Sequence, residues 1–551
     1  MVVILYPAME LTRREIMAAP LLMQAPARRP NIVLVMTDDQ GYGDVGLHGN
    51  PVLETPNIDS IARQGVRFTQ FHVSPVCAPT RASLMTGRWN YRTGVTDTYL
   101  GRAMMRPTEV TLAETLRAAG YRTGIFGKWH LGDNAPLRAT EQGFETSVLH
   151  RGGGLAQPSS PPGTGYFDPP LERNNVPYTA RGYCTDIFFD ETLAFIDRHR
   201  ASPFFAYVST NSPHTPLQIG DEWVAPFRGR GLDDTTEKIY GMVANVDHGL
   251  GRLLGHLRRT GLDRNTIVVF LTDNGPQQPG RFNAGLRGLK GTPYQGGIQV
   301  PCFLQWPGQV RPGSTVDAPA PHIDLMPTLL DMAGIPAPKS PKIDGLSLWP
   351  AIQGQSPPPD RPLCLQWHRG DEPEPFRNSA YRVGPWKLVN GEELYNLDID
   401  PFERTDIARF WPDRVRALRT GYEEWFRDVG SAGYAPPPIW LGSELENPVL
   451  LTRQDWRGPD AQWTTKSLGH YEVEVKQPGN YEVELRFPKL DAAAKAVFTL
   501  GNARIEHEAK AGATSIKLPP LALPSGPGRA VGRLESAGEV WGAHYLLVRR
   551  L

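Results

Sequence analysis

Two apolar segments far apart in the sequence are followed by the same kind of polar ending. Residues 31–36 (NIVLVM) and 265–271 (NTIVVFL) each lead through a threonine into a polar pair, namely Asp38 with Asp39 and Asp273 with Asn274. Near-continuous aliphatic runs are typical of strands buried on both faces of a parallel sheet. Because such sheets bind ligands at the carboxyl ends of their strands, we expect these four side chains to converge on one point.

Three carboxylates held close together repel one another unless a cation lies among them. An all-oxygen set favours a hard ion over Zn²⁺, so the pattern predicts a Ca²⁺ site, with Mg²⁺ as the less favoured ion. The alternative is that these residues only form the turns that close two strands. The matching ends of the two strands favour the metal site.

Cationic and imidazole side chains follow other strand-like or glycine-rich stretches, which indicates an anionic substrate. These candidates are Arg81, Lys128, His130, His214 beyond the apolar segment 203–209, and Lys290 in the loop 285–297. Taken singly, each has an ordinary alternative, because a lone Lys or Arg is usually a solvated charge and a lone His is often a core residue. Their shared position near one edge of the sheet favours a binding site.

Cys77 lies at the predicted start of a helix. Pro79 suits the first helical turn, and Gly87 suits the helix end. A helix start attracts anions and lowers the pKa of a thiol, so a thiolate nucleophile is one interpretation. The nearby carboxylates and a hard metal favour oxygen chemistry instead, which indicates that the sulfur itself is not the reacting group.

The elements that position these residues are alternating strands and helices. Helical spacing over 111–121, 188–199 and 240–257, together with the buried segments, predicts an α/β fold with a mixed, largely parallel sheet between helices. Residues 1–29 have the layout of a signal segment, 30–335 form the α/β part, 336–438 a smaller α+β part, and 441–551 an all-β sandwich. Strict alternation over 470–487 around Pro-Gly-Asn predicts a hairpin in that sandwich.

Composition excludes some classes of protein. The 551 residues are 40% hydrophobic and 21% charged, with zero formal net charge, which is typical of globular protein and argues against a nucleic-acid binder. Four scattered cysteines do not make a disulfide framework. The pair Arg13-Arg14 before the short apolar run 16–23 predicts twin-arginine export to the periplasm or beyond, and no segment is long enough to span a membrane.

The stretch 77–88, Cys-Ala-Pro-Thr-Arg-Ala-Ser-Leu-Met-Thr-Gly-Arg, resembles the signature of the type I sulfatases, in the alkaline phosphatase superfamily, and the similarity spans roughly residues 30–430. The resemblance implies that a formylglycine-generating maturation enzyme oxidises Cys77 to an aldehyde. It further implies that residue 77 binds Ca²⁺ together with Asp38, Asp39, Asp273 and Asn274. Arg81 and Lys128 would hold the aldehyde hydrate, and Lys128, His214 and Lys290 the sulfate group.

The implied reaction is hydrolysis of a sulfate monoester, either an aryl sulfate or a sulfated carbohydrate. One hydroxyl of the hydrate attacks sulfur, His214 with Lys290 protonates the leaving alcohol, and His130 takes a proton as sulfate is expelled. One alternative is a phosphomonoester, phosphodiester or phosphonate hydrolase on the same scaffold. Another is a non-catalytic binder of sulfated glycans that uses the sandwich, for which we expect an accessory role.

Overall fold

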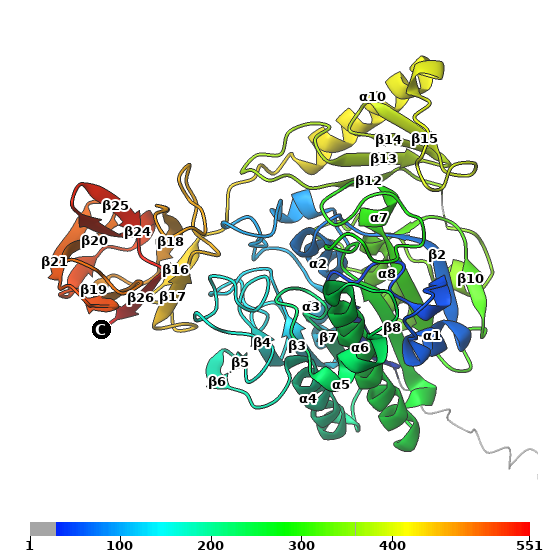
Figure 1. The fold of residues 1–551 in the computed structure, drawn as a ribbon, viewed down its shortest axis with the longest axis horizontal. Coiled ribbons are helices and arrows are strands. Elements are labelled where there is room, and N and C mark those ends of the chain that lie inside the picture. The colour runs from blue at the N-terminus through cyan, green and yellow to red at the C-terminus, as the bar shows by residue number, and fades with distance from the viewer. Residues whose placement is uncertain (1–28, 359) are drawn as a thin grey trace, which may run out of the picture.

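The computed structural model describes residues 29–358 and 360–551, so the predicted signal segment lies almost wholly outside the described residues. A large sheet enclosed by helices carries a smaller four-stranded sheet above it, and a β-sandwich lies to one side (Figure 1). This arrangement confirms the predicted fold class. The predicted limits of the parts, at residues 335, 438 and 441, stay predictions.

The large sheet has 11 strands in the order β10-β2-β9-β8-β1-β7-β3-β4-β5-β6, with β11 paired to β2. At its centre β8, β1, β7 and β3 run parallel, and β9 and β5 join antiparallel. The strands are β1 Asn31–Thr37, β2 Val66–His72, β3 Arg122–Lys128, β4 Thr146–His150, β5 Pro170–Arg173, β6 Val176–Thr179, β7 Phe204–Ser209, β8 Thr266–Thr272, β9 Gln299–Gln305, β10 Ser314–Val316 and β11 Ala320–Pro321.

Helices cover both faces of this sheet. As a result, every residue of β1 is buried. Ile32 and Leu34 pack with α2, α3 and α8, whereas Val33 and Val35 pack with α1, α4 and α6. These helices are α1 Pro56–Arg63, α2 Cys77–Thr86, α3 Leu112–Ala118, α4 Cys184–His199, α6 Asp234–Arg259 and α8 Leu325–Met332. Shorter helices are α5 Asp221–Val224, α7 Gln295–Ile298 and α9 Trp349–Ile352, with 3₁₀ turns at Gly46–His48, Asn90–Thr93, Ala225–Phe227, Asp263–Asn265, His322–Asp324 and Ala408–Phe410.

Local sequence explains how the predicted helix at 111–121 begins and ends. The Thr111 hydroxyl accepts a hydrogen bond from the Glu114 backbone at 3.0 Å, and the Glu114 carboxylate accepts one from the Thr111 backbone at 2.8 Å, which is a capping box. The helix ends at Ala118, just before Gly120 with a φ of +91°. This helix packs on the face of the sheet that α2 also covers.

The smaller sheet is antiparallel throughout, in the order β12-β13-β14-β15. Its elements are β12 Leu363–Gln366, β13 Ser379–Val383, β14 Trp386–Val389, β15 Glu393–Asn396 and the long helix α10 Pro412–Val429. Leu418 and Tyr422 of α10 pack against the sheet residues Tyr381 and Leu388, so the helix closes one face. The predicted α+β character of this region is confirmed.

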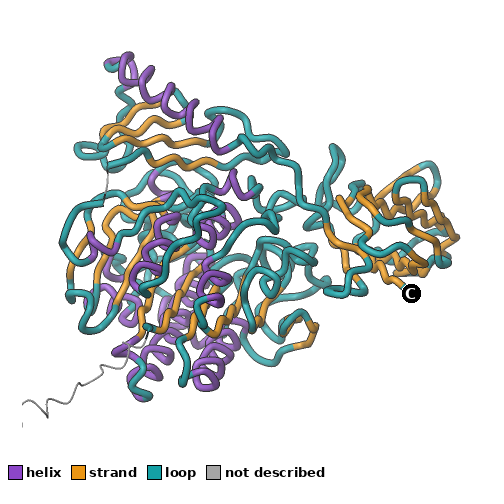
Figure 2. The backbone as a smooth tube through the Cα atoms, turned by 180° about the vertical axis from the view of Figure 1, so that it is seen from behind, coloured by secondary structure: helices purple, strands orange, loops and turns teal. Residues whose placement is uncertain are grey.

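Residues 441–551, all of which the structure describes, contain strands and loops but no helix (Figure 2). One sheet contains β16 Ile439–Leu441, β18 Tyr471–Val475, β24 Gly526–Ser536, β20 Ala494–Leu500, β21 Ala503–Ala509 and β25 Glu539–Gly542. The facing sheet contains β17 Val449–Thr452, β26 Tyr545–Arg550, β19 Gly479–Arg486, β22 Ser515–Lys517 and β23 Leu521–Leu523. Side chains from both sheets form one apolar core around Trp456 and Tyr481, as expected of a sandwich.

The predicted hairpin over 470–487 is wrong. The strand β18 pairs with β16 and β24, whereas β19 pairs with β22, β23 and β26 in the opposite sheet. Alternation shows that each strand has one buried face, but it does not say which strand is the neighbour. The turn at Pro478 and Gly479 therefore carries the chain from one sheet to the other.

The sandwich is joined to the large sheet by buried polar contacts as well as by the chain. The Glu446 carboxylate accepts hydrogen bonds from the Ala135 backbone at 2.7 Å and from the Asn134 amide at 2.9 Å. Arg138 and Arg151 donate to the carbonyls of Leu445 and Leu450. Residues 134 and 135 belong to the loop that follows β3, so the sandwich fixes the segment just beyond two predicted site residues.

Two further features are the apolarity of the helices and the state of the cysteines. Among the described residues no helix combines the length and apolarity that a membrane crossing requires. All four cysteines are buried and unpaired.

The Glu446 contacts predict that removing this carboxylate lowers the stability of the folded protein. Glu446→Ala leaves the buried Ala135 N–H without its acceptor, so the free energy of unfolding should fall by about 1–3 kcal/mol. Urea denaturation followed by tryptophan fluorescence measures this loss. Glu444→Ala is the matched control, because Glu444 is exposed in the same loop and should change stability by less than about 0.5 kcal/mol. Equal losses in both variants would contradict a specific role for Glu446.

Candidate active site

Four neighbouring parallel strands, β8, β1, β7 and β3, end at one edge of the large sheet and carry most of the predicted site. Taken in strand order, the residues at or just beyond these ends are Asp273, Asn274, Asp38, Asp39, His214 and Lys128. Arg81 reaches the same place from α2, and Lys290 from the glycine-rich loop before α7. The structure thus brings together side chains that the sequence places more than two hundred positions apart, such as Asp39 and Asn274.

One half of the cluster is a buried network of ion pairs. The Lys128 Nζ lies 2.6 Å from an Asp38 oxygen. The Arg81 guanidinium donates to Asp273 at 2.6 and 3.1 Å and lies 3.8 Å from Asp38. All four side chains are at most 1% exposed. Removing charges from water is costly unless they are paired this closely, so the network depends on every partner being present.

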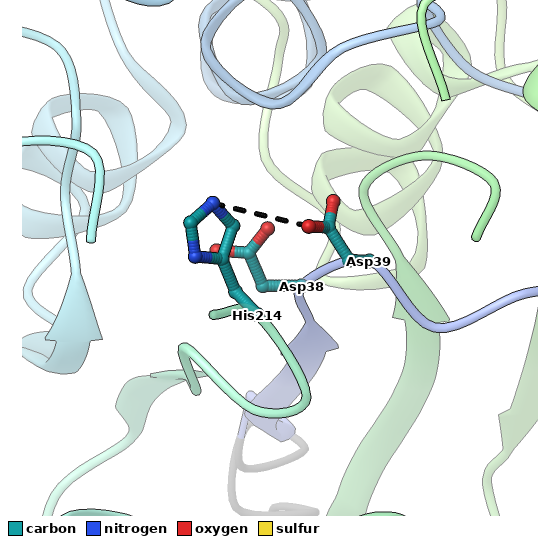
Figure 3. A group of neighbouring side chains, drawn as sticks. All are labelled: Asp38, Asp39 and His214. Carbon is teal, nitrogen blue, oxygen red and sulfur yellow. Dashed lines mark ion pairs between the residues drawn. The ribbon is translucent and has the colours of Figure 1, made fainter. Parts of the chain in front are cut away.

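Asp39 is the centre of the other half. One of its oxygens lies 2.6 Å from the Lys290 Nζ and accepts a hydrogen bond from the Asn274 amide at 2.7 Å. Its second oxygen faces the His214 Nε2 at 3.8 Å (Figure 3). The backbone of Asp39 has a φ of +64°, a left-handed conformation that is uncommon for residues other than glycine. Strained backbone of this kind is concentrated at functional sites.

Three buried oxygen atoms at this edge have no hydrogen-bond partner: Asp38 Oδ1, Asp39 Oδ2 and Asn274 Oδ1. A buried acceptor without a partner is costly, and a cation would satisfy all three. Ligand atoms of Asp38, Cys77 and Asp273 lie within 4.8 Å of one another, as do those of Asp38, Asp39 and His214. The donors are mostly oxygen, so the residues present fit a hard divalent cation such as Ca²⁺.

The protonation of the carboxyl groups reflects their crowding. Burial, reinforced by the negative charge of Asp38, raises the pKa of the Asp273 carboxyl to about 7. Burial also opposes ionisation of Asp38, but the charges of Lys128 and His214 outweigh it and hold the pKa of Asp38 far below its usual range. The protein's own cations therefore stabilise the ionised form of Asp38 more than that of Asp273. A further cation would favour ionisation of Asp273 more than that of Asp38.

Cys77 is the first residue of α2, and that helix ends at Gly87 with a φ of +65°, as predicted. The expectation of a lowered thiol pKa is wrong. Burial raises the pKa of the Cys77 thiol above its usual value, although Lys128 and Lys290 oppose that shift. The thiol is only 2% exposed, so desolvation outweighs the favourable helix start. An unmodified Cys77 is consequently a poor nucleophile.

His130 lies beside the ion-pair network and adopts a left-handed backbone with a φ of +60°. Its Nε2 is 2.7 Å from the Thr98 carbonyl, so this nitrogen carries the ring hydrogen in the neutral form. Its Nδ1 is buried and has no hydrogen-bond partner. Burial, reinforced by Lys128, lowers the pKa of the imidazole well below its usual value, which keeps the ring neutral with Nδ1 free to accept a proton.

The sequence predicts that the Gly/Pro-rich residues 150–180 form a loop over one edge of the sheet, but it does not single out the residues in that loop that cover both histidines. A Cβ on Gly153 would lie 2.5 Å from the His130 Nε2, and one on Gly154 would lie 3.0 Å from the His214 Cε1. The Gln157 Oε1 is also buried at this place without a hydrogen-bond partner. The sequence shows a Gly/Pro-rich loop here, and the run of three glycines at 152–154 was the one available sign of a close approach.

Comparisons with known proteins place this geometry in a family. The family model described as Sulfatase matches residues 30–335, more than half of the chain, and the model for N-sulphoglucosamine sulphohydrolase, C-terminal, matches residues 290–410. Human arylsulfatase A is 34% identical over 448 residues, covering 75% of this chain and 86% of that protein. Mouse N-acetylgalactosamine-6-sulfatase is 32% identical over 417 residues, covering 70% and 77%.

A solved structure agrees with these relatives. The crystal structure of Ps i-CgsB in complex with k-i-k-neocarrahexaose superposes with a TM-score of 0.68 at 30% identity, covering 74% of this chain and 95% of that one. The matching family models stop at residue 410, so the sandwich lies beyond them. Together with the cluster around Cys77, these matches show that the chain belongs to the type I sulfatase family and is a sulfuric ester hydrolase.

Proposed function

We propose that the protein hydrolyses sulfate monoesters with a formylglycine made from Cys77 and a bound Ca²⁺. The observation that carries this proposal is the group of unpartnered oxygens and buried cations around the first residue of α2. The raised pKa of the Cys77 thiol supports oxygen rather than sulfur as the attacking atom. Oxidation of that side chain to an aldehyde, which is hydrated in water, would supply such an oxygen.

The residues that would hold Ca²⁺ are Asp38, Asp39, Asp273, Asn274 and residue 77. When bound, the ion offsets the negative charge of the sulfate ester and lowers the cost of forming an oxyanion at residue 77. Lys128 and Arg81 interact electrostatically with residue 77 and would orient its side chain. Lys290 and His214 each face one oxygen of Asp39, and we assign the sulfate group to them.

The two histidines would divide the proton transfers. The His214 Nδ1 lies 2.7 Å from the Thr215 carbonyl and therefore carries a hydrogen, so the ring gives up a proton from Nε2 only as an imidazolium. Burial lowers the pKa of His214 below its usual value, and the charges of Asp38 and Asp39 oppose that shift and so favour the imidazolium. His130 is the complementary base, because its buried Nδ1 has no partner.

The relatives, rather than a balance of charges, favour a sulfate ester over a phosphate monoester. Asp38, Asp39 and Asp273 carry three negative charges when ionised, and Arg81, Lys128 and Lys290 carry three positive ones. A divalent cation and an imidazolium at His214 would add three positive charges, which suit a monoanionic or a dianionic ester. The family match to sulfatases supports the sulfate ester.

We propose sulfated carbohydrates as the natural substrate class, with aryl sulfates as small surrogates. Support comes from relatives whose names include N-acetylgalactosamine-6-sulfatase and from the neighbouring structure in complex with a neocarrahexaose. Export through residues 1–29 to the periplasm or beyond fits this class, since such polymers lie outside the cell. A formylglycine-generating enzyme is the maturation partner that this mechanism requires.

Mass spectrometry of the peptide 74–88 is the direct test of the nucleophile. We expect active protein to carry an aldehyde or its hydrate at residue 77, and Cys77→Ala to lose at least about a thousandfold in kcat/KM for 4-nitrophenyl sulfate. The native enzyme should also prefer this ester to 4-nitrophenyl phosphate. An unmodified thiol in fully active protein, or a preference for the phosphate, would contradict the proposal.

Calcium removal tests the metal. Chelation followed by gel filtration should abolish activity and lower the unfolding temperature, and added Ca²⁺ should restore both more fully than Mg²⁺. Because Asp273 must lose its proton to bind a cation, Ca²⁺ affinity measured by calorimetry should weaken as the pH falls below about 7. Affinity that does not change with pH between about 5 and 8 would argue against Asp273 as a ligand.

The glycines over the histidines provide a test of positioning. A Cβ added by Gly153→Ala must displace the His130 ring, and a displacement of that size should lower kcat/KM for 4-nitrophenyl sulfate by about a hundredfold. The unfolding temperature and the aldehyde content should stay unchanged. Gly255→Ala is the control, since its Cβ would meet only the flexible end of Arg259 on α6. Full activity in Gly153→Ala would show that His130 is not held by this loop.

A further inference from the structure

A cavity of about 710 Å³ lies where the three parts of the chain meet. The loop 99–102 forms one side, the segment 369–372 after β12 a second, and the sandwich segments 457–462 and 470–472 with Arg529 the third. The volume falls within the roughly 300–1,000 Å³ of pockets that bind small organic ligands, and such pockets favour domain junctions. Nothing in the mechanism proposed above uses this cavity.

The cavity adjoins the active site through two of its lining segments. Tyr99 lines the cavity, and the carbonyl of the preceding residue, Thr98, lies 2.7 Å from the His130 Nε2. Trp367, two residues before the lining residue Arg369, donates from its indole to the carbonyl of Gly291, the residue after Lys290, at 2.7 Å. The lining segments are therefore joined by hydrogen bonds to the proposed base and to the loop that carries Lys290.

Arg369 lines the cavity and lies between the Tyr99 and Trp367 rings. Its guanidinium lies 4.6 Å from the centre of the Tyr99 ring and 5.0 Å from that of the Trp367 ring, so both aromatic rings hold it in place. Its Nε lies 3.4 Å from the buried Asp97 carboxylate, and the side chain is still 51% exposed. A guanidinium that is held by stacking and by one carboxylate, with other N–H groups open to solvent, can bind an anion with little loss of conformational freedom.

Four arginines and three carboxylates line the cavity, namely Arg102, Arg369, Arg457 and Arg529 with Asp371, Glu372 and Glu472. Arg102 and Arg457 share a single oxygen of Asp371, at 2.9 and 2.6 Å, so two guanidinium groups have one carboxylate between them. Arg529 pairs with Glu472 at 2.9 Å and is 68% exposed. Planar guanidinium groups match the oxygens of sulfate and carboxylate, while the exposed carboxylates and Gln462 can bond to sugar hydroxyls.

We propose that this cavity binds the sulfated sugar units next to the one whose sulfate is cleaved, so that the sandwich forms part of the substrate-binding site. The inference rests on the proposed function, because it assigns the substrate class of the same active site. It makes the enzyme selective for sulfated oligosaccharides over sulfated monosaccharides. The sandwich contributes this selectivity through Arg457 and Arg529.

Calorimetric titration of the full chain carrying Cys77→Ala tests the proposal without turnover. The probes are hexasaccharides of κ-carrageenan and of chondroitin 6-sulfate, each compared with its sulfated monosaccharide. In at least one series the hexasaccharide should bind at least about tenfold more tightly than the monosaccharide. Adding Arg369→Ala or Arg529→Ala should remove about tenfold of hexasaccharide affinity and leave monosaccharide affinity unchanged.

Arg504→Ala is the matched control, because Arg504 is an exposed arginine of the same sandwich that pairs with Glu506 away from the cavity. It should bind both probes as the parent does. Hexasaccharides no tighter than monosaccharides in both series would overturn the proposal, as would equal effects of Arg529→Ala and Arg504→Ala. Hydrolysis of 4-nitrophenyl sulfate by the unmutated enzyme, measured separately, shows whether the proposed function itself holds.

Discussion

Three carboxylates and three cationic side chains form one buried cluster at the carboxyl ends of the central parallel strands. The surrounding fold has to hold them in contact. Charges removed from water are tolerated only at close range, and the distances of 2.6 Å from Lys128 to Asp38 and from Lys290 to Asp39 meet that condition. A rigid scaffold is needed to keep such distances. The central strands supply it, because β1 is buried on both faces and flanked by parallel partners along its length.

The close pairing also explains why oxygen atoms are left without partners. Each cation satisfies one side of a carboxylate, and the opposite oxygens of Asp38 and Asp39 lie in the buried interior of the cluster. Water is a poor substitute for a cation in such a place. If a divalent cation binds here as proposed, the folded chain would already hold its ligands together, which would lower the free-energy cost of assembling the site.

The sequence was sufficient for features that depend on local pattern. Buried strands, the start of α2 at Cys77 and the polar endings after β1 and β8 all follow from apolar runs, Pro79, Gly87 and paired acidic residues. Features that depend on distant neighbours could not be predicted in this way. The strands β18 and β19 alternate perfectly and yet belong to opposite sheets, because alternation defines a buried face and not a partner.

Within the site, the same distinction separates what was predicted from what was missed. The strand-end residues carry their own signal, whereas Thr98, Gly153 and Gln157 lie in loops whose paths are set by tertiary contacts. The pKa of Cys77 was mispredicted for a related reason. A helix start is visible in the sequence, but the burial that outweighs it comes from the strands and loops packed around it.

The position of the sandwich changes how the division of the chain should be understood. Sequence boundaries suggest an appended module, since the matching family models end before it. Yet Gln454 of the sandwich donates to the same Thr98 carbonyl that the His130 ring contacts, and Glu446 binds the loop beyond β3. The sandwich therefore touches the supports of a proposed catalytic base as well as the adjoining cavity. If His130 is the base and the cavity binds substrate, as proposed, the sandwich belongs to the active site and is more than a tethered accessory.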